Sequence, residues 1–152
     1  DGGERDDLIV GGAGADTVVG GAGADSLYGG AGRDLIVCGT FDIPGAADPG
    51  VRPDRIYYTA LSDSTVKRPD FIEDLNSHAI IDLDQIDANE TKAGDQKFVL
   101  VSAFTGHAGE LTLTYVADND VTFLQGDVDG DGAADLEIDI SGDHTDFTGF
   151  VL

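Results

Sequence analysis

The sequence has few basic residues, one cysteine and no long apolar segment. Eight Lys and Arg stand against 30 Asp and Glu among 152 residues, which gives a formal charge of −22. A chain this acidic would repel nucleic acid and anionic membranes. A single cysteine excludes an internal disulfide, and the lack of a long apolar run excludes a transmembrane helix. The chain starts inside a repeat at Asp1, without Met or signal peptide, so we expect a fragment with a further domain upstream.

A nine-residue pattern fills the first quarter of the chain. Between Gly2 and Val37 the four copies read GGERDDLIV, GGAGADTVV, GGAGADSLY and GGAGRDLIV. The Gly-Gly-x-Gly runs predict turns, because glycine accepts positive φ. The three residues after each acid are strand-sized, so position eight faces inward and its neighbours outward. The sixth-position acids are Asp7, Asp16, Asp25 and Asp34, and the eighth-position apolar residues are Ile9, Val18, Leu27 and Ile36.

One copy of this pattern cannot bury enough apolar surface to fold alone. Stacked copies bury a continuous row, which is the rule for repeat proteins. Two copies make one coil of a flattened parallel β-roll, so copies n and n+2 lie above each other. This stacking places Asp7 on Asp25 and Asp16 on Asp34.

Stacked carboxylates repel one another unless a cation lies between them. Asp oxygens and turn carbonyls are the ligands that Ca²⁺ prefers, whereas Mg²⁺ gives up its waters reluctantly. A flexible Gly/Asp-rich linker is the alternative, but a linker has no reason to keep a nine-residue phase. Since bound calcium also offsets the −22 charge, folding and calcium binding should be linked, with an expanded calcium-free form.

The nine-residue repeat is interrupted after Val37 and then resumes. Cys38 and Gly39 are compatible with the opening of a fifth copy, and Cys38 is expected to be a small buried residue. A loop over residues 40–53 then intrudes, with three of the four prolines. Asp54 takes the sixth position of a resumed copy and is expected over Asp25. Asp70 begins a later segment of the same kind.

From about Asn76 the sequence is no longer repetitive. Alternating patterns predict strands over Lys97–Val101, Glu110–Val116, Val121–Gln125 and Leu136–Ile140, with a hairpin turn over 118–120. One short segment, Asp82–Ala88, has weak helical periodicity. We therefore expect an all-β protein: a β-roll of calcium-binding nonapeptide repeats (residues 1–75) followed by a β-sandwich-like C-terminal cap (residues 76–152).

A second acidic motif lies between two predicted strands. Its acids match the start of an EF-hand loop, with Gly130 and Gly132 between them. Position twelve is Ile138 instead of the bidentate Glu, and strands replace helices, so it is not an EF-hand. We expect a shorter calcium loop of the form D-x-D-x-D-G-x-x-D, and a solvated acidic turn is the alternative. Its acids are Asp127, Asp129, Asp131 and Asp135.

The motifs of catalysis are missing from the sequence. There is no H-E-x-x-H, and His78, His107 and His144 are scattered, so we expect surface or hydrogen-bonded histidines. No serine lies in G-x-S-x-G, and no glycine-rich loop carries the P-loop lysine. This stretch of chain is therefore predicted to be non-catalytic.

Three stretches together resemble the C-terminal half of serralysin-type secreted metalloproteases. These are GGAGADTVVGGAGADSLY, the segment IIDLDQIDANETKAGDQKFVLV with AFTGHAGELTLTY, and LQGDVDGDGAADLEIDISG with the terminal FVL. The nonapeptide alone is shared by many RTX (hemolysin-type calcium-binding) proteins. The resemblance implies calcium bound by turn glycines and repeat acids, which carries over to Gly12, Gly14, Asp16, Gly21, Gly23, Asp25, Gly30, Gly32 and Asp34.

The resemblance also implies a ligand pair and a secretion signal. Acids seven residues apart near the end of the roll bind calcium in such proteins, and Asp63 and Asp70 have that spacing. The extreme C-terminus of the family is an uncleaved signal for type I secretion from Gram-negative bacteria, usually an acid followed by hydrophobic residues. Here Gly149 precedes the hydrophobic end, and the loop over residues 40–53 interrupts the fifth repeat.

Two functions follow from these observations. The first is a calcium-binding RTX module that stays unfolded in the low-calcium cytoplasm, folds outside the cell and supports type I secretion of a larger protein. Its partners are calcium ions, the secretion machinery and the upstream domain of the same polypeptide. The alternative is a polysaccharide- or cell-surface-binding module that uses outward positions seven and nine, where Arg5 and Arg33 are the basic residues nearby.

Overall fold

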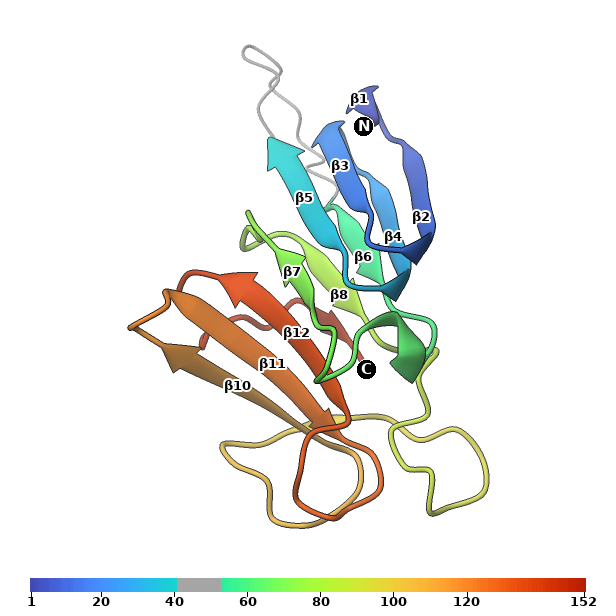
Figure 1. Ribbon diagram of the computed structural model, residues 1–152, viewed down its shortest axis with the longest axis vertical. Coiled ribbons are helices and arrows are strands. Elements are labelled where there is room, and N and C mark those ends of the chain that lie inside the picture. The colour runs from blue at the N-terminus through green and yellow to red at the C-terminus, as the bar shows by residue number, and fades with distance from the viewer. Residues whose placement is uncertain (41–52) are drawn as a thin grey trace.

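The computed structural model describes residues 1–40 and 53–152, and the loop expected over 40–53 lies almost wholly outside these residues (Figure 1). The described residues are nearly all strand and turn, as predicted. Their only helix is one 3-10 turn, η1 (Leu61–Asp63). In this part of the chain, no helix is long and apolar enough to cross a membrane.

Two sheets contain all the strands of residues 1–40 and 53–152. The larger sheet has the order β1 (Gly3–Glu4), β3 (Thr17–Ala22), β5 (Leu35–Thr40), β7 (Asp70–Ile72), β12 (Leu136–Ser141), β11 (Val121–Asp127), β10 (Glu110–Val116) and β9 (Val99–Leu100). The smaller sheet has the order β13 (Phe150–Val151), β8 (Ile80–Asp82), β6 (Arg55–Tyr57), β4 (Ser26–Gly32) and β2 (Leu8–Gly14).

The repeats form the predicted β-roll, with successive strands in alternate sheets (Figure 1). Parallel pairing joins residues 18 apart, as in Leu8 with Ser26 and Thr17 with Leu35. Two nine-residue copies therefore make one coil. The eighth-position side chains form the buried row, in which Val18, Leu27 and Ile36 are almost fully excluded from solvent.

The repeat geometry continues past the break in the sequence. Strand β6 pairs with β4 and β7 pairs with β5, so Ile56 and Ile72 extend the buried row. Gly39 pairs with Gly21 in the repeat register, and Cys38 is buried, as expected. The fifth copy thus begins in phase before residue 41.

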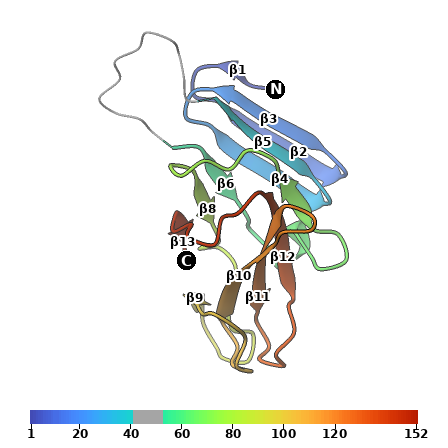
Figure 2. The ribbon, with the colours of Figure 1, turned by 90° about the vertical axis from the view of Figure 1, so that its left-hand side faces the viewer.

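Both sheets continue into the C-terminal region (Figure 2). Strand β7 pairs in parallel with β12, which then pairs antiparallel with β11, and β11 with β10. On the other sheet, β8 joins β6 to the C-terminal β13. The predicted hairpin is confirmed, with Val116 opposite Val121. Its inward residues, together with those of β12, form the core of this region: Leu111, Leu124, Leu136, Ile138 and Ile140.

One local prediction was wrong, and another was right only in part. The segment 82–88 is not helical, because the N–H of Asp84 donates to Asp82 Oδ1 (3.1 Å) and that of Ile86 to the Leu83 carbonyl (2.9 Å). An Asp side chain that accepts from its own backbone two residues on favours a turn over a helix. The strand over Lys97–Val101 is also shorter than expected, since only Val99 and Leu100 pair with β10.

Candidate metal centre

Six acids form two columns along the roll, each at the start of a strand. In every step, Oδ1 of one acid accepts the backbone N–H of the acid one coil earlier, at 2.8–2.9 Å. The stacking predicted for the repeats is thus confirmed, and Asp54 lies over Asp25 as expected. One column is Asp7, Asp25 and Asp54, and the other is Asp16, Asp34 and Asp70.

The second oxygen of most column acids has no hydrogen-bond partner. Five of these Oδ2 atoms are buried without a well-aligned donor, those of Asp7, Asp16, Asp25, Asp34 and Asp70. Of the five, Asp70 has a nearby hydroxyl, that of Tyr58, which lowers the pKa of Asp70. A buried polar atom without a partner is rare in folded proteins and costs about 1–3 kcal/mol or more when the group is charged. Five such atoms along the two columns fit a cation-binding role, because several hard cations could satisfy them.

The electrostatics of the columns lead to the same conclusion. Burial raises the pKa of Asp25 and Asp34, and raises the pKa of Asp54 to about 6 and that of Asp70 to about 7. The N–H donated to each carboxylate offsets part of this rise, and the neighbouring acid of the column adds to it. Near neutral pH the ionised columns are therefore unfavourable unless positive charge enters them.

The turn glycines predicted from the repeats share one kind of backbone conformation. The six predicted positions, Gly12, Gly14, Gly21, Gly23, Gly30 and Gly32, all have positive φ, between 94° and 158°. A Cβ on Gly30 would also collide with the Gly12 carbonyl oxygen of the previous coil. The first glycine of each copy was not assigned a role from sequence. In the structure a Cβ on Gly29 would lie 2.6 Å from Oδ2 of Asp34, so glycine here makes room for the carboxylate.

Asp63 lies next to the second column, although it belongs to η1 and not to a repeat. Its Oδ2 accepts the N–H groups of Thr59 (2.8 Å) and Ala60 (3.0 Å). Its charge also contributes to the raised pKa of Asp34 and of Asp70. The structure thus brings Asp63 and Asp70 into one electrostatic environment.

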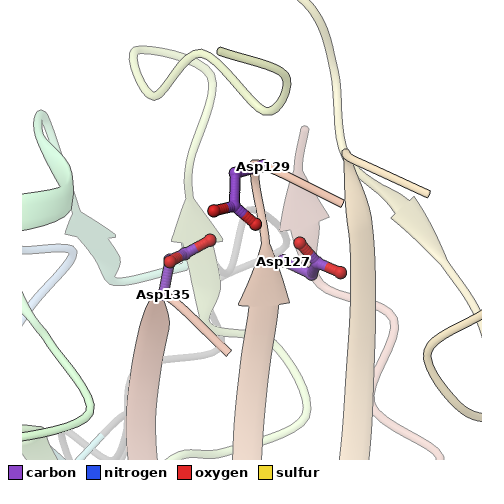
Figure 3. Close-up of side chains that lie close together, drawn as sticks. All are labelled: Asp127, Asp129 and Asp135. Atoms are coloured by element: carbon purple, nitrogen blue, oxygen red, sulfur yellow. The ribbon is translucent and has the colours of Figure 1, made fainter. Parts of the chain in front are cut away.

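The second acidic motif is the loop that joins β11 to β12 (Figure 3). Asp127, Asp129 and Asp135 each offer an oxygen within 4.8 Å of the others, whereas Asp131 is not part of this group. The buried Asp127 accepts the N–H groups of Gly130 (2.7 Å) and Gly132 (2.9 Å). This loop therefore differs from the columns, because backbone donors already satisfy its buried acid.

Sequence reasoning missed one acid that takes part in the roll. Asp74 accepts the N–H of Cys38 (2.7 Å) with Oδ1 and that of Gly39 (2.9 Å) with Oδ2. It continues the support of the turns where the repeat is interrupted, and no spacing in the sequence indicates it. The histidines fit the expectation of hydrogen-bonded or surface residues: His144 Nε2 lies 2.9 Å from the Ser141 carbonyl, and His107 is 82% exposed.

Comparison with known proteins agrees with these observations. The family described as peptidase M10 serralysin C-terminal matches residues 2–152. Metalloprotease AprA of Pseudomonas entomophila is 40% identical over 80 residues, which is 52% of this chain and 16% of that protein. The chain thus matches only a small part of this relative's length.

Two solved structures match the chain over nearly its whole length. They are the AlgE6R2 and AlgE6R3 subunits of a mannuronan C5-epimerase from Azotobacter vinelandii. The first is 19% identical with a TM-score of 0.54, over 99% of this chain and 92% of that one. The second is 24% identical with a TM-score of 0.49, over 99% and 80%. At such identity the likeness to AlgE6R2 concerns the fold alone.

Proposed function

Because the chain belongs to the serralysin C-terminal family of M10 peptidases, we propose that it is a calcium-binding module whose folding outside the cell supports type I secretion of a larger protein. The chain itself is the non-catalytic part of such a protein. The observation that carries the proposal is the set of five buried Oδ2 atoms without well-aligned donors along the two acid columns.

We propose that the column acids and the turn carbonyls hold the calcium ions. The acids are Asp7, Asp16, Asp25, Asp34, Asp54 and Asp70, with Asp63 beside the second column. The carbonyls are those of Gly12, Gly14, Gly21, Gly23, Gly30 and Gly32. Bound calcium would supply positive charge to carboxylates that burial otherwise drives toward protonation. We also propose a weaker calcium site at Asp127, Asp129 and Asp135, with Asp131 at its edge, because their own backbone donors compete with the ion.

The mechanism is thermodynamic. In a cytoplasm with little calcium, the charge of −22 keeps the chain expanded and able to thread through an exporter. Outside a Gram-negative cell, calcium at about 10⁻⁴–10⁻³ M matches the affinity typical of extracellular modules. Binding to the folded state alone then pulls the equilibrium toward the roll. Folding outside would also oppose backsliding of the chain.

The C-terminal hydrophobic residues support this order of events. Phe150 and Val151 form β13, which pairs with β8 at the edge of the smaller sheet. In the folded state their backbone is therefore engaged. We propose that the secretion machinery recognises this segment before the chain folds. We also propose that the roll and the region after residue 75 are the two parts of the module. We further propose that the upstream domain of the parent is a secreted metalloprotease.

A calcium titration followed by far-UV circular dichroism tests the proposal. We expect a cooperative coil-to-β transition at sub-millimolar to millimolar calcium, which magnesium does not reproduce. Asp34→Asn keeps an oxygen acceptor but removes charge from a column, so its midpoint should shift to higher calcium by roughly tenfold. Asp118→Asn removes the same charge from an exposed turn and should shift it little. A chain with native β-structure in chelator would overturn the proposal.

A further inference from the structure

Two tyrosines are stacked on the outer face of the smaller sheet. Tyr28 of β4 and Tyr57 of β6 lie side by side, with ring centroids 4.5 Å apart and planes 4° from parallel. Leu27 and Ile56 beside them are buried in the core. Because successive side chains of a strand point to opposite faces, both tyrosines point outward.

A charged pair extends the stack in one direction. Arg55 Cζ lies over the Tyr57 ring, 5.5 Å from its centroid. Its Nε lies 3.0 Å from Oδ2 of Asp82, the residue opposite Tyr57 on β8. This pair holds the guanidinium against the ring by a cation–π contact. We call these four residues, Tyr28, Tyr57, Arg55 and Asp82, the aromatic ladder.

In the other direction the ladder ends above a short side chain. Val10 of β2 is opposite Tyr28 and is 62% exposed. A valine is much shorter than a tyrosine, so the outer part of the Tyr28 ring has a free face above Val10. The next residue on that outer face of β2, Leu8, is also exposed. Val10 and Leu8 thus form a low apolar surface beside the Tyr28 ring, with the tyrosine hydroxyls at its edge and the Arg55–Asp82 pair beyond Tyr57.

We propose that the aromatic ladder binds an uncharged polysaccharide, with one pyranose ring stacked on the free face of Tyr28. A β-linked pyranose with equatorial hydroxyls presents an apolar face of axial C–H groups, which suits an aromatic ring. Its rim of hydroxyls suits the tyrosine hydroxyls, and further sugars of the same chain can reach the Arg55–Asp82 pair beyond Tyr57, since such sites combine apolar contact with a few polar groups. This activity goes beyond calcium-driven folding and requires only that the roll is folded.

The charge of the molecule decides between uncharged and acidic glycans. A polyanion would meet a chain of charge −22 and the Asp82 carboxylate at the ladder itself. Arg55 is already paired with Asp82, so it offers little net attraction. An uncharged chain does not incur this repulsion.

Binding of oligosaccharides by isothermal titration calorimetry tests the inference. The probes are cellohexaose, xylohexaose and mannohexaose, with hexagalacturonate as the acidic comparison. The whole chain is used with calcium present, after circular dichroism has shown each variant to be folded. We expect at least one uncharged hexaose to bind, and hexagalacturonate to bind more weakly.

Two variants target the stacking position in opposite ways. Tyr28→Ala removes the ring, and Val10→Tyr covers its free face while keeping Tyr28. Each should weaken binding by about tenfold, the upper range for one aromatic contact. Tyr115→Ala, on the other sheet, should leave binding unchanged. The inference is overturned if no uncharged hexaose binds, if only hexagalacturonate binds, or if both variants of the stacking position bind like the original chain.

Discussion

The repeat region and the C-terminal region share two sheets but bury different kinds of side chain. The repeats bury acids beside their apolar residues, whereas the C-terminal strands bury mainly apolar residues. A repeat strand such as β4 contributes one buried apolar side chain, Leu27, and follows one column acid, Asp25. Strand β12 instead contributes three buried apolar side chains, Leu136, Ile138 and Ile140. One such side chain contributes about 2 kcal/mol, whereas ordering each backbone residue costs about 1–2 kcal/mol. This comparison predicts that the roll depends on its acid columns being neutralised, and that the antiparallel region depends on its core.

Removing calcium should produce the largest difference in stability between the two regions. In excess chelator, amide hydrogens of β2–β5 should exchange at least roughly 100-fold faster than in 10 mM calcium, because ligand binding to the folded state sets their protection. Amides of β10–β12 should change much less. Hydrogen exchange measured by mass spectrometry checks this expectation, with magnesium in place of calcium as control. Equal loss of protection in both regions would show instead that the module folds as one cooperative unit.

Truncating one core side chain in each region should show the same difference in calcium dependence. Ile36→Ala and Leu124→Ala each remove a fully buried side chain and should each cost about 3 kcal/mol of the free energy of unfolding in saturating calcium. For Ile36→Ala the loss should also appear as a higher calcium midpoint, because in the proposed mechanism the roll forms only with the ion. Leu124→Ala should leave the midpoint nearly unchanged. Urea unfolding at several calcium concentrations measures both effects, and identical calcium dependence would contradict the division.

The contrast between the regions also explains what could be predicted from sequence. The nine-residue phase specifies the 18-residue coil, so the stacking of Asp7 on Asp25 and of Asp16 on Asp34 followed from spacing alone. Asp54 lies 29 residues after Asp25, so it was placed by the resumed pattern of its own copy. No spacing indicates that β7 pairs with β12, since this contact joins two segments far apart that have no common period. The same holds for Asp74, whose role depends on where the chain returns after the interruption. The stacked Tyr28 and Tyr57 required knowing which strand lies beside β4.

Two glycines separate the effect of close packing in the roll from the effect of positive φ alone. Gly30 and Gly132 both have positive φ, at 94° and 84°. A Cβ on Gly30 would strike the Gly12 carbonyl oxygen, whereas a Cβ on Gly132 would meet open space. Gly132→Ala should therefore cost only the backbone strain, about 1 kcal/mol, and Gly30→Ala about 2 kcal/mol or more. Thermal unfolding in calcium measures the difference, and equal costs would argue against tight stacking of the turns.

The smallest expected effect concerns an acid of the C-terminal region that belongs to no column. Asp139 lies on β12, between Phe71 of β7 and Phe123 of β11, and its Oδ1 is buried without a hydrogen-bond partner. Burial, with a further contribution from Glu137, raises the pKa of Asp139 to about 6. Because the folded state holds this proton more tightly than the unfolded state, stability should fall as pH rises from about 4 through 6.

Asp139→Asn removes this penalty without changing the size of the side chain. In saturating calcium it should stabilise the fold at pH 8 by about 1 kcal/mol, after allowance for solvent screening, and by much less at pH 5. Asp118→Asn in the exposed turn is the control and should show no such pH dependence. Urea unfolding at the two pH values measures the effect. A loss of stability at pH 8 would mean that the Asp139 carboxylate is paired with a cation, so that this region, like the roll, relies on neutralised acids.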